Sequence, residues 1–491
     1  MRSIVTVLLL LVSVASHAAD KPNVLFIAVD DMRPDLGCYG AGFVTSPNLD
    51  RLAASGVTFT RAYCQQAVCS PSRTSLLTGK RPDTTQVHDL VTHFRDTIPD
   101  TVTLPQIFKR NGYQAVGMGK IYHGGYDDEA SWSEPHRSPK GTKGYAIPEN
   151  QKIVEASRAK GKARGLEGKA LQRAGRGPAT ESADVPDDAY HDGAVAEMAI
   201  ESLETFAHGD EPFFLAVGFV KPHLPFVSPK KYWDLYDRQS FALPGNYDVP
   251  TKDAPPFAGT NWGELRNYSD IPENGALDAD KALELIHGYY AALSYTDAQI
   301  GKLLDALDEQ NLAENTIVVV WGDHGWKLGD HGMWCKHTNY ELDAHVPLIM
   351  RAPGKQAGIQ SERLVEFVDI YPTLAELAGL DAPSDLEGTS FAPLLDDPNR
   401  PWKAAAFSQY PRAHERQQLM GYSMATDRHR LTRWADRENP SKLVATELYD
   451  HETDPAENVN VAEHPEYAKT LAELSALAEK GWRGVRDELK K

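Results

Sequence analysis

Two short segments contain residue types that could bind a divalent cation. Asp30 and Asp31 are adjacent, and Asp323 is followed by His324. Neighbouring buried carboxylates repel each other and lose hydration unless a cation or hydrogen-bond donors compensate, although aspartates at loop starts also serve as turn formers and helix caps. Carboxylate oxygens favour Ca²⁺ or Mg²⁺, whereas the imidazole leaves Mn²⁺ or Zn²⁺ open.

Each of these pairs follows a short apolar segment that we predict to be a buried strand. Residues 23–29 and 316–321 are continuous apolar runs rich in β-formers, and residues 212–219 form a third run that leads to Lys221 and His223. Open α/β sheets bind ligands at the carboxyl ends of their strands. The polar groups at these three strand ends are therefore expected to converge on one site.

Helical patterns separate these strands. They cover residues 49–55, 104–111, 193–206, 283–310 and 370–378. This alternation predicts an α/β domain at residues 20–399, with a large, mixed, mostly parallel sheet between helices. Beyond residue 400, short alternating segments predict a small antiparallel sheet, and an amphipathic pattern predicts a helix near 467–477. We assign residues 400–491 to a smaller C-terminal α+β subdomain.

The charge and the N-terminus restrict the class of partner. The 491-residue chain has a formal net charge of −18, which argues against nucleic-acid binding and requires a locally basic pocket for any anionic substrate. Residues 1–19 contain Arg2, an apolar run and then small residues, the pattern of a secretory signal peptide. No later run predicts a membrane span. We expect an exported protein, periplasmic or secreted.

A basic segment at residues 136–180 interrupts the predicted α/β domain. It is rich in Gly, Ala, Lys and Arg, and between 158 and 176 only Glu167 opposes a series of basic residues. These are Arg158, Lys160, Lys162, Arg164, Lys169, Arg173 and Arg176. Such a run usually forms a solvated insertion loop; the alternative is a basic flap that attracts a polyanion.

The four cysteines are too few for a disulfide scaffold in a chain of this length. Cys38 and Cys64 could form a bridge or serve as small buried apolar residues. Cys69 differs from these because Pro71 and Arg73 follow it at the start of a predicted short helix.

Residues 69–79 match the C-x-P-S-R…T-G signature of the type I sulfatases, and the chain resembles the iduronate-2-sulfatase branch of that family. The Asp323-His324 pair fits this branch, since many other sulfatases have Asn at the second position. Further matching segments are 29–34, 36–40, 65–69, 81–85, 213–218, 221–223, 294–295, 323–326, 345–349, 408–412 and 420–423. The resemblance implies an alkaline-phosphatase-like sulfatase fold. The segment 126–190 has no counterpart that we recognise in the branch.

The resemblance also implies a role for each candidate residue. A maturation enzyme would oxidise Cys69 to formylglycine, whose hydrate is the nucleophile, and Arg73 would stabilise that hydrate. One Ca²⁺ would be bound by Asp30, Asp31, Cys69 in its modified form, Asp323 and His324. Sulfate binding and proton transfer would involve Lys120, His123, His223 and Lys336.

The resemblance therefore favours a sulfatase that acts on a sulfated sugar, with a 2-O-sulfated uronic acid of a polysaccharide or oligosaccharide as the expected substrate. Two alternatives remain open. Some phosphonate and phosphodiester hydrolases of the same superfamily also carry formylglycine and an Asp-His metal pair. If Cys69 is not matured, the chain would be a catalytically silent glycan-binding protein.

Overall fold

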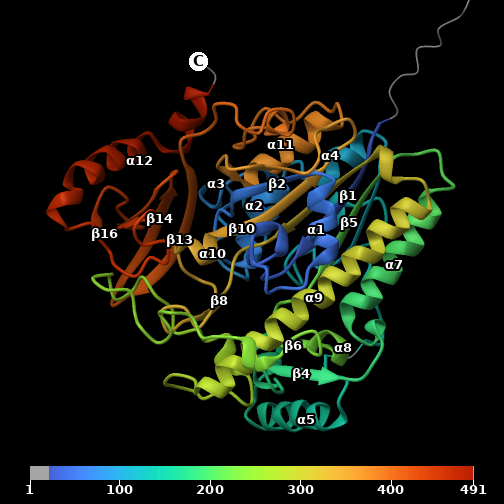
Figure 1. The fold of residues 1–491 in the computed structure, drawn as a ribbon, viewed down its shortest axis with the longest axis horizontal. Helices are drawn as coiled ribbons and strands as arrows, with labels where there is room; N and C mark the ends of the chain where they lie inside the picture. The colour runs from blue at the N-terminus through green and yellow to red at the C-terminus, as the bar shows by residue number, and fades with distance from the viewer. Residues whose placement is uncertain (1–20, 143, 490–491) are drawn as a thin grey trace, which may run out of the picture.

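The computed structural model describes residues 21–142 and 144–489, and its centre is one large twisted sheet between helices (Figure 1). The strand order is β11-β2-β10-β7-β1-β5-β3, with β12 paired to β2. The strands are β1 (Asn23–Val29), β2 (Val57–Tyr63), β3 (Gln114–Gly119), β5 (Phe213–Phe219), β7 (Thr316–Gly322), β10 (His345–Arg351), β11 (Ile359–Ser361) and β12 (Val365–Glu366). The predicted signal peptide at residues 1–19 lies outside the described residues.

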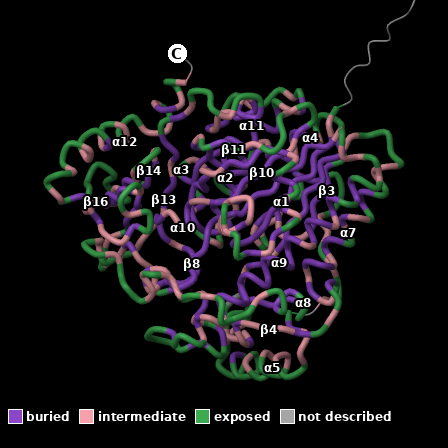
Figure 2. Tube along the Cα trace, in the orientation of Figure 1, coloured by how far each residue is buried: buried purple, intermediate pink, exposed green. Residues whose placement is uncertain are grey.

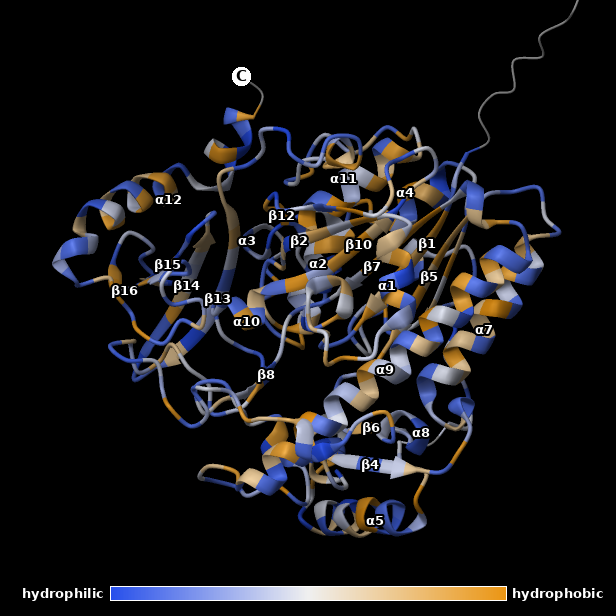
Figure 3. Ribbon diagram, viewed as in Figure 1, coloured by the Kyte–Doolittle hydropathy of each residue, from blue (hydrophilic) through white to orange (hydrophobic). Residues whose placement is uncertain are grey.

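Helices cover both faces of this sheet, and alternate residues of β1 enter two separate cores. Leu25, Ile27 and Val29 pack with α1 (Pro47–Ala54), α7 (His191–Phe206) and α9 (Ala279–Glu309). The intervening β1 residues pack with α2 (Cys69–Thr78), α4 (Leu104–Arg110) and α11 (Phe367–Leu377). A strand buried on both faces is apolar throughout, which is why the central strands are purple in Figure 2 and largely orange in Figure 3.

The three predicted strands are adjacent, and their carboxyl ends are in register. β1 pairs in parallel with β5 and β7, so that Val29 lies opposite both Phe219 and Gly322. The Asp30 N–H donates to Phe219 O at 3.2 Å, and the Asp323 N–H donates to Val29 O at 3.1 Å. The polar groups that follow these strands are thus brought to one edge of the sheet, as the sequence predicts.

The sheet is mixed because β10 runs antiparallel to both β2 and β7. The sequence pattern identified none of β2, β3 and β10. In β10, Pro347 interrupts the strand pattern, and the register with β2 shifts between Val346 and Leu348. In β3, Gly117 replaces an apolar residue because a Cβ there would lie 2.7 Å from the Trp132 ring.

The C-terminal sheet is separate from the large one and purely antiparallel. Its strands are β13 (Ala406–His414), β14 (Gln417–Ala425), β15 (His429–Asp436) and β16 (Leu443–Asp450). The amphipathic helix α12 (Ala468–Glu488) packs on it through Leu474 and Val485, beside the main body in Figure 1. The predicted antiparallel sheet and terminal helix are therefore both present, and the helix is kinked at Gly481, where the backbone is not helical (φ 61°, ψ −176°).

The basic segment 136–180 is not the loop that the sequence suggests. It contains α5 (Pro148–Ala163) and α6 (Gly168–Ala174), which pack against each other, and ends in β4 (Thr180–Ala183), paired with β6 (Phe226–Pro229). Short elements complete the structure. They are α3 (Pro82–Thr85), α8 (Lys230–Trp233), α10 (Glu341–Ala344), β8 (Lys327–Leu328) and β9 (Trp334–Cys335).

The structure also bears on the predictions about disulfide pairing and membrane spans. Cys38, Cys64, Cys69 and Cys335 are all unpaired, so the Cys38–Cys64 bridge does not form. Cys64 is instead fully buried, with its Sγ 3.8 Å from the Asp343 carbonyl. Across residues 21–142 and 144–489, none of the helices combines the length and apolar character needed to traverse a bilayer.

Candidate active site

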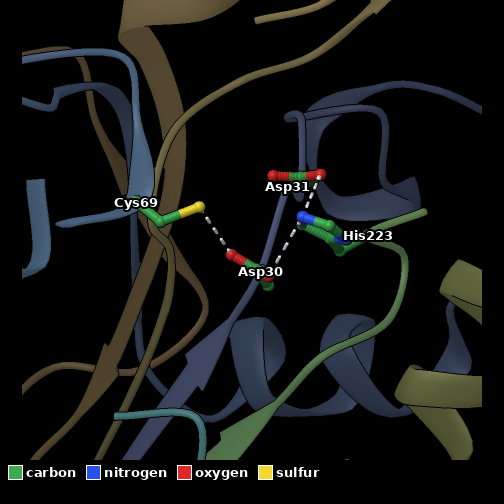
Figure 4. A group of neighbouring side chains, drawn as sticks. All are labelled: Asp30, Asp31, Cys69 and His223. Carbon is green, nitrogen blue, oxygen red and sulfur yellow. Dashed lines mark hydrogen bonds and ion pairs between the residues drawn. The ribbon is translucent and has the colours of Figure 1, made fainter. Parts of the chain in front are cut away.

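The adjacent aspartates lie directly after β1 and are completely buried. Asp31 adopts a left-handed backbone conformation (φ 62°), and its N–H donates to Asp323 Oδ1 at 3.0 Å. This turn directs the Asp30 and Asp31 carboxylates into the same space, where Figure 4 shows them with Cys69 and His223. The two strand ends thus bring three carboxylates together.

Cys69 is the first residue of α2, and its thiol faces these carboxylates. Its Sγ lies 3.3 Å from Asp30 Oδ1 and 3.3 Å from His324 Nε2. All of α2 is buried, and its N-terminus presents the positive end of the helix dipole to the site. Burial and the neighbouring Asp30 raise the pKa of the Cys69 thiol well above its ordinary value. The unmodified side chain is therefore a neutral thiol, which is a poor nucleophile.

Arg73 lies one turn further along α2 and is fully buried among anionic groups. Its Nε donates to Asp323 Oδ2 at 2.8 Å, its Nη2 lies 3.3 Å from Asp30 Oδ1, and its Nη1 donates to the Ile121 carbonyl at 3.0 Å. The guanidinium also lies over the Trp321 ring, 5.5 Å from its centroid. Arg73 therefore connects two metal-ligand candidates on neighbouring strands and does not face the open pocket.

Lys120 follows β3 and forms an ion pair with Asp30, with its Nζ also 3.7 Å from Cys69 Sγ. Burial opposes ionisation of Asp30, but Lys120, His223 and Arg73 outweigh it and lower the Asp30 pKa well below its ordinary value. His123 lines the same pocket, and its ring stacks on Tyr126 at 6.1 Å between centroids.

Lys336 and His223 both approach the Asp31 carboxylate. Lys336 Nζ lies 3.0 Å from Asp31 Oδ1. His223 Nε2 lies 3.9 Å from Asp31 Oδ2, while its Nδ1 is 2.6 Å from the Leu224 carbonyl. The Nδ1 atom must carry the proton to make that hydrogen bond, so Nε2 is the nitrogen that faces the pocket. Burial and Lys336 lower the pKa of His223.

Glu264, which no sequence pattern predicted, contacts both Lys336 and His223. Its Oε1 lies 3.0 Å from His223 Nε2, and its Oε2 lies 2.9 Å from Lys336 Nζ and 3.5 Å from His337 Nε2. Burial opposes ionisation of Glu264, but Lys336 and His223 lower its pKa well below the ordinary value. Glu264 comes from an irregular loop with no motif around it, so no sequence signal identified it.

These residues lie at a pocket of about 1260 Å³. Its walls include Cys69, Lys120, His123, His223, Glu264 and Lys336. Asp30, Asp31, Arg73, Asp323 and His324 lie beneath it with no measurable exposure. The structure thus places the predicted sulfate-contacting residues and Cys69 on the pocket wall, and the other four predicted metal ligands below them.

The donor set beneath the pocket fits a divalent cation. Oxygen or nitrogen donors of Asp30, Asp323 and His324 lie within 4.8 Å of one another and of Cys69 Sγ. His324 Nδ1 lies 3.0 Å from the Gly325 carbonyl, so the ring presents the lone pair of Nε2 to the site. Burial and Asp30 raise the pKa of Asp31 to about 7 despite the nearby Lys336. Burial is the main cause of this shift, and a divalent cation bound by these carboxylates would favour the ionised form of Asp31.

Comparisons with known proteins agree with this geometry. The family model named Sulfatase matches residues 22–380, and the model named N-sulphoglucosamine sulphohydrolase, C-terminal, matches residues 329–481. Iduronate 2-sulfatase of Homo sapiens is 36% identical, over 91% of this chain and 92% of its own.

Solved structures share the fold. A structure of an enzyme in complex with its substrate D-glucosamine-2-N,6-O-disulfate superposes with a TM-score of 0.73 at 24% identity, over 95% of this chain and 98% of the other. A phosphonate monoester hydrolase from Silicibacter pomeroyi superposes with a TM-score of 0.70 at 23% identity, over 94% of each chain. The fold is thus the alkaline-phosphatase-like one that the resemblance implied. The chain belongs to the sulfatase family, as a type I sulfuric ester hydrolase that resembles iduronate 2-sulfatase.

Proposed function

We propose that this protein is an exported sulfatase that hydrolyses the sulfate monoester of a 2-O-sulfated uronic acid within a polysaccharide or oligosaccharide. The observation that carries the proposal is the position of Cys69, at the start of α2 and 3.3 Å from both Asp30 and His324. Two comparisons support this choice of substrate. A relative with 36% identity is named iduronate 2-sulfatase, and a solved structure that shares the fold contains D-glucosamine-2-N,6-O-disulfate as its substrate.

Two groups that the chain does not itself encode complete the proposed site. Converted to formylglycine by a maturation enzyme, Cys69 would supply a hydrated aldehyde with one hydroxyl to attack sulfur and a second to release the sulfate. Asp30, Asp31, Asp323 and His324 would hold Ca²⁺, whose charge would favour the deprotonated hydroxyl and the bound sulfate. The neutral, high-pKa thiol of Cys69 is consistent with a need for such maturation.

The cations on the pocket wall suit a sulfate monoester. The ester carries one negative charge, and more develops on its bridging oxygen as the S–O bond breaks. Lys120 Nζ is 3.7 Å from Cys69 Sγ, while Lys336 Nζ approaches from the side of Asp31. Two ammonium groups therefore border the position where the sulfate would meet the nucleophile.

His223 is the residue that we assign to protonation of the leaving sugar alcohol. Its Nε2 faces the pocket and lies 3.0 Å from Glu264 Oε1, a carboxylate that favours the protonated ring. Lys221 supports the histidine from behind, because its Nζ donates to the His223 carbonyl at 2.6 Å. The imidazole is thus held in place as a general acid.

The proposal is tested with protein co-expressed with a formylglycine-generating enzyme. Mass spectrometry of the peptide that contains Cys69 should detect the aldehyde, and the protein should then release sulfate from a 2-O-sulfated uronate disaccharide. A sulfate, a phosphate and a phosphonate monoester of one alcohol should be compared in parallel. A preference for the phosphorus esters would refute the proposal in favour of a phosphonate or phosphodiester hydrolase, and an intact thiol in protein from the native host would favour a silent glycan-binding protein.

Export is proposed on the sequence pattern of residues 1–19. N-terminal sequencing of the protein from the native host should give a chain that begins near residue 20. A mature chain that retains residues 1–19 would refute export by this signal.

A further inference from the structure

The basic helices α5 and α6 border the same pocket as the proposed active site. We call residues 148–176 the basic hairpin. The pocket that contains Cys69 and Lys336 is also lined by Arg158, Arg173 and Arg176 of this hairpin. In Figure 1, α5 lies apart from the large sheet, beyond β4 and β6. A volume of about 1260 Å³ exceeds the roughly 300–1,000 Å³ of most small-molecule sites, so the pocket has room for more than one sugar.

The two helices of the hairpin contact each other closely at glycines. A Cβ on Gly161 would lie 2.9 Å from Leu171 Cδ1, so the absence of a side chain lets α5 and α6 approach. A Cβ on Gly175 would lie 2.2 Å from Arg158 Cγ, which means that the Arg158 stem crosses the backbone at Gly175. This contact fixes the first part of the Arg158 side chain and leaves its guanidinium to line the pocket.

The base of the hairpin is fixed by Glu181, a buried residue of β4. Its carboxylate accepts hydrogen bonds from the Ala146 N–H at 2.6 Å, from Asn150 Nδ2 at 2.8 Å and from the Tyr190 hydroxyl at 2.7 Å. Buried hydrogen bonds of this kind are not expected for the solvated insertion loop that was one of the two alternatives. The start of α5 is therefore held against β4, which places the backbone of the hairpin beside the pocket.

The third arginine is held by an aromatic residue. The Arg176 guanidinium lies over the Tyr268 ring, 4.7 Å from its centroid, and donates to the Tyr268 hydroxyl. Tyr268 also lines the pocket. Stacking of this kind orients a guanidinium while leaving N–H groups free to bind an anion.

The hairpin brings positive charge to the pocket in a chain with a net charge of −18. Arg158 and Arg173 are exposed. Among residues 21–142 and 144–489, no carboxylate lies within ion-pair distance of the three pocket-lining arginines of the hairpin, although Glu264 attracts Arg176 from a longer distance. The acidic residues that line the pocket are Asp127, Glu155 and Glu264. Of these, Glu264 is already paired with His223 and Lys336.

We propose that Arg158, Arg173 and Arg176 form a second anion subsite, which binds a sulfate or carboxylate on the sugar chain that carries the cleaved sulfate. Planar guanidinium groups bind such oxyanions through paired hydrogen bonds. This inference rests on the proposed function and narrows the substrate to oligosaccharides with at least two anionic groups. It also selects between the two alternatives for the basic segment, in favour of a substrate-binding flap.

Binding measurements on a Cys69→Ser background test the subsite without turnover. The ligands are a 2-O-sulfated uronate–glucosamine disaccharide with a second sulfate on the glucosamine, the same disaccharide without that sulfate, and the disulfated form with its carboxyl group reduced. Adding Arg158→Gln and Arg173→Gln should weaken calorimetric binding of the disulfated ligand roughly ten- to a hundredfold, as expected for one or two lost hydrogen bonds between charged groups. If the subsite binds sulfate, the ligand without the second sulfate should be unaffected; if it binds carboxylate, the reduced ligand should be unaffected.

The matched control is Lys162→Gln with Arg164→Gln, which removes the same charge from exposed positions of the hairpin that do not line the pocket. We expect this variant to bind all three ligands within about twofold of the Cys69→Ser parent. The inference is overturned if the control loses as much affinity as Arg158→Gln with Arg173→Gln, if the latter binds all three ligands as the parent does, or if the parent binds none. Turnover by the matured wild type is a separate measurement: failure there refutes the proposed function, whereas the binding differences test the subsite alone.

Discussion

Glu264→Gln is the perturbation that best tests the assignment of His223 as a proton donor. Glu264 Oε1 lies 3.0 Å from His223 Nε2, and Glu264 Oε2 lies 2.9 Å from Lys336 Nζ. Glutamine has nearly the same shape but no charge, so the substitution removes an interaction that favours the imidazolium. The pKa of His223, already lowered by burial and by Lys336, should therefore fall further.

The 3.0 Å distance between Glu264 Oε1 and His223 Nε2 sets a minimum for this decrease in the pKa of His223. At about 3 Å, two unit charges interact with about 1.4 kcal/mol in a medium as polar as water and about 5.5 kcal/mol at an effective dielectric constant of ~20. Since one pKa unit corresponds to about 1.4 kcal/mol, the water-like limit already gives a decrease of about one unit. His223 and Glu264 are mostly buried, with side-chain exposures of 17% and 18%, so the water-like value is the lower bound.

The measurement is kcat/KM as a function of pH for the matured enzyme on one sulfate ester, since kcat/KM reports the ionisation of groups in the free enzyme. A general acid must be protonated, so activity falls as the pH rises through the pKa of His223. In Glu264→Gln that decrease should occur at least about one pH unit lower than in the wild type. Glu155→Gln is the control, because Glu155 lines the same pocket but is exposed. Coincident profiles for Glu264→Gln and wild type, or an equal displacement in Glu155→Gln, would refute the assignment.

Three further predictions concern the nucleophile, the metal and a buried charge cluster. Cys69→Ser should reduce sulfate release to background while its circular dichroism spectrum stays unchanged; substantial residual turnover would disprove the nucleophile assignment. EGTA should abolish activity and Ca²⁺ should restore it, whereas full activity after exhaustive chelation would exclude a required cation. Lys403→Met should lower the free energy of unfolding at pH 7 by about 3–5 kcal/mol in urea titrations, because Glu366, 2.6 Å from Lys403 Nζ, keeps only Arg81 as a cationic partner and the buried Asp369 loses its contact with Lys403. Burial opposes ionisation of Glu366, but Arg81 and Lys403 lower its pKa to about 2. The stabilisation from ionised Glu366 is present above the ordinary pKa of a glutamate and is lost as the pH falls towards 2. If Lys403→Met still has a lower free energy of unfolding than the wild type near pH 2, this reasoning is contradicted.

The sequence predicted the central strands because their environment leaves a simple pattern. β1 lies between two parallel neighbours and is buried on both faces, so its residues from Val24 to Val29 are all apolar, and its observed bounds equal the predicted ones, 23–29. The polar residues that follow β1 and β7 then had to meet, because parallel strands end at the same edge. The strand assignment alone therefore predicts that Asp30 and Asp323 lie close together.

Other elements depend on partners that the local sequence does not reveal. The antiparallel direction of β10 is set by its pairing with β2 and β7 across the sheet. The helix α5 was missed for a different reason, since its few apolar residues give a weak periodic pattern. Its Ala, Glu, Gln, Lys and Arg residues are nevertheless strong helix formers, so a summed propensity would have identified it.

The predicted residues of the site and the residues that were missed come from different kinds of structural element. The groups assigned to the reaction, such as Asp30, Cys69 and Arg73, follow or begin elements of the packed core, where backbone register fixes their positions. The groups that the sequence did not reveal are Glu264, which contacts His223 and Lys336 from an irregular loop, and the pocket-lining arginines, which the basic hairpin brings to the site. Core elements leave periodic patterns and recognisable motifs, whereas loop and hairpin residues reach the pocket only through long-range packing. The class of reaction is therefore readable from the sequence, whereas the positions of Glu264 and of the hairpin arginines at the pocket require the three-dimensional structure.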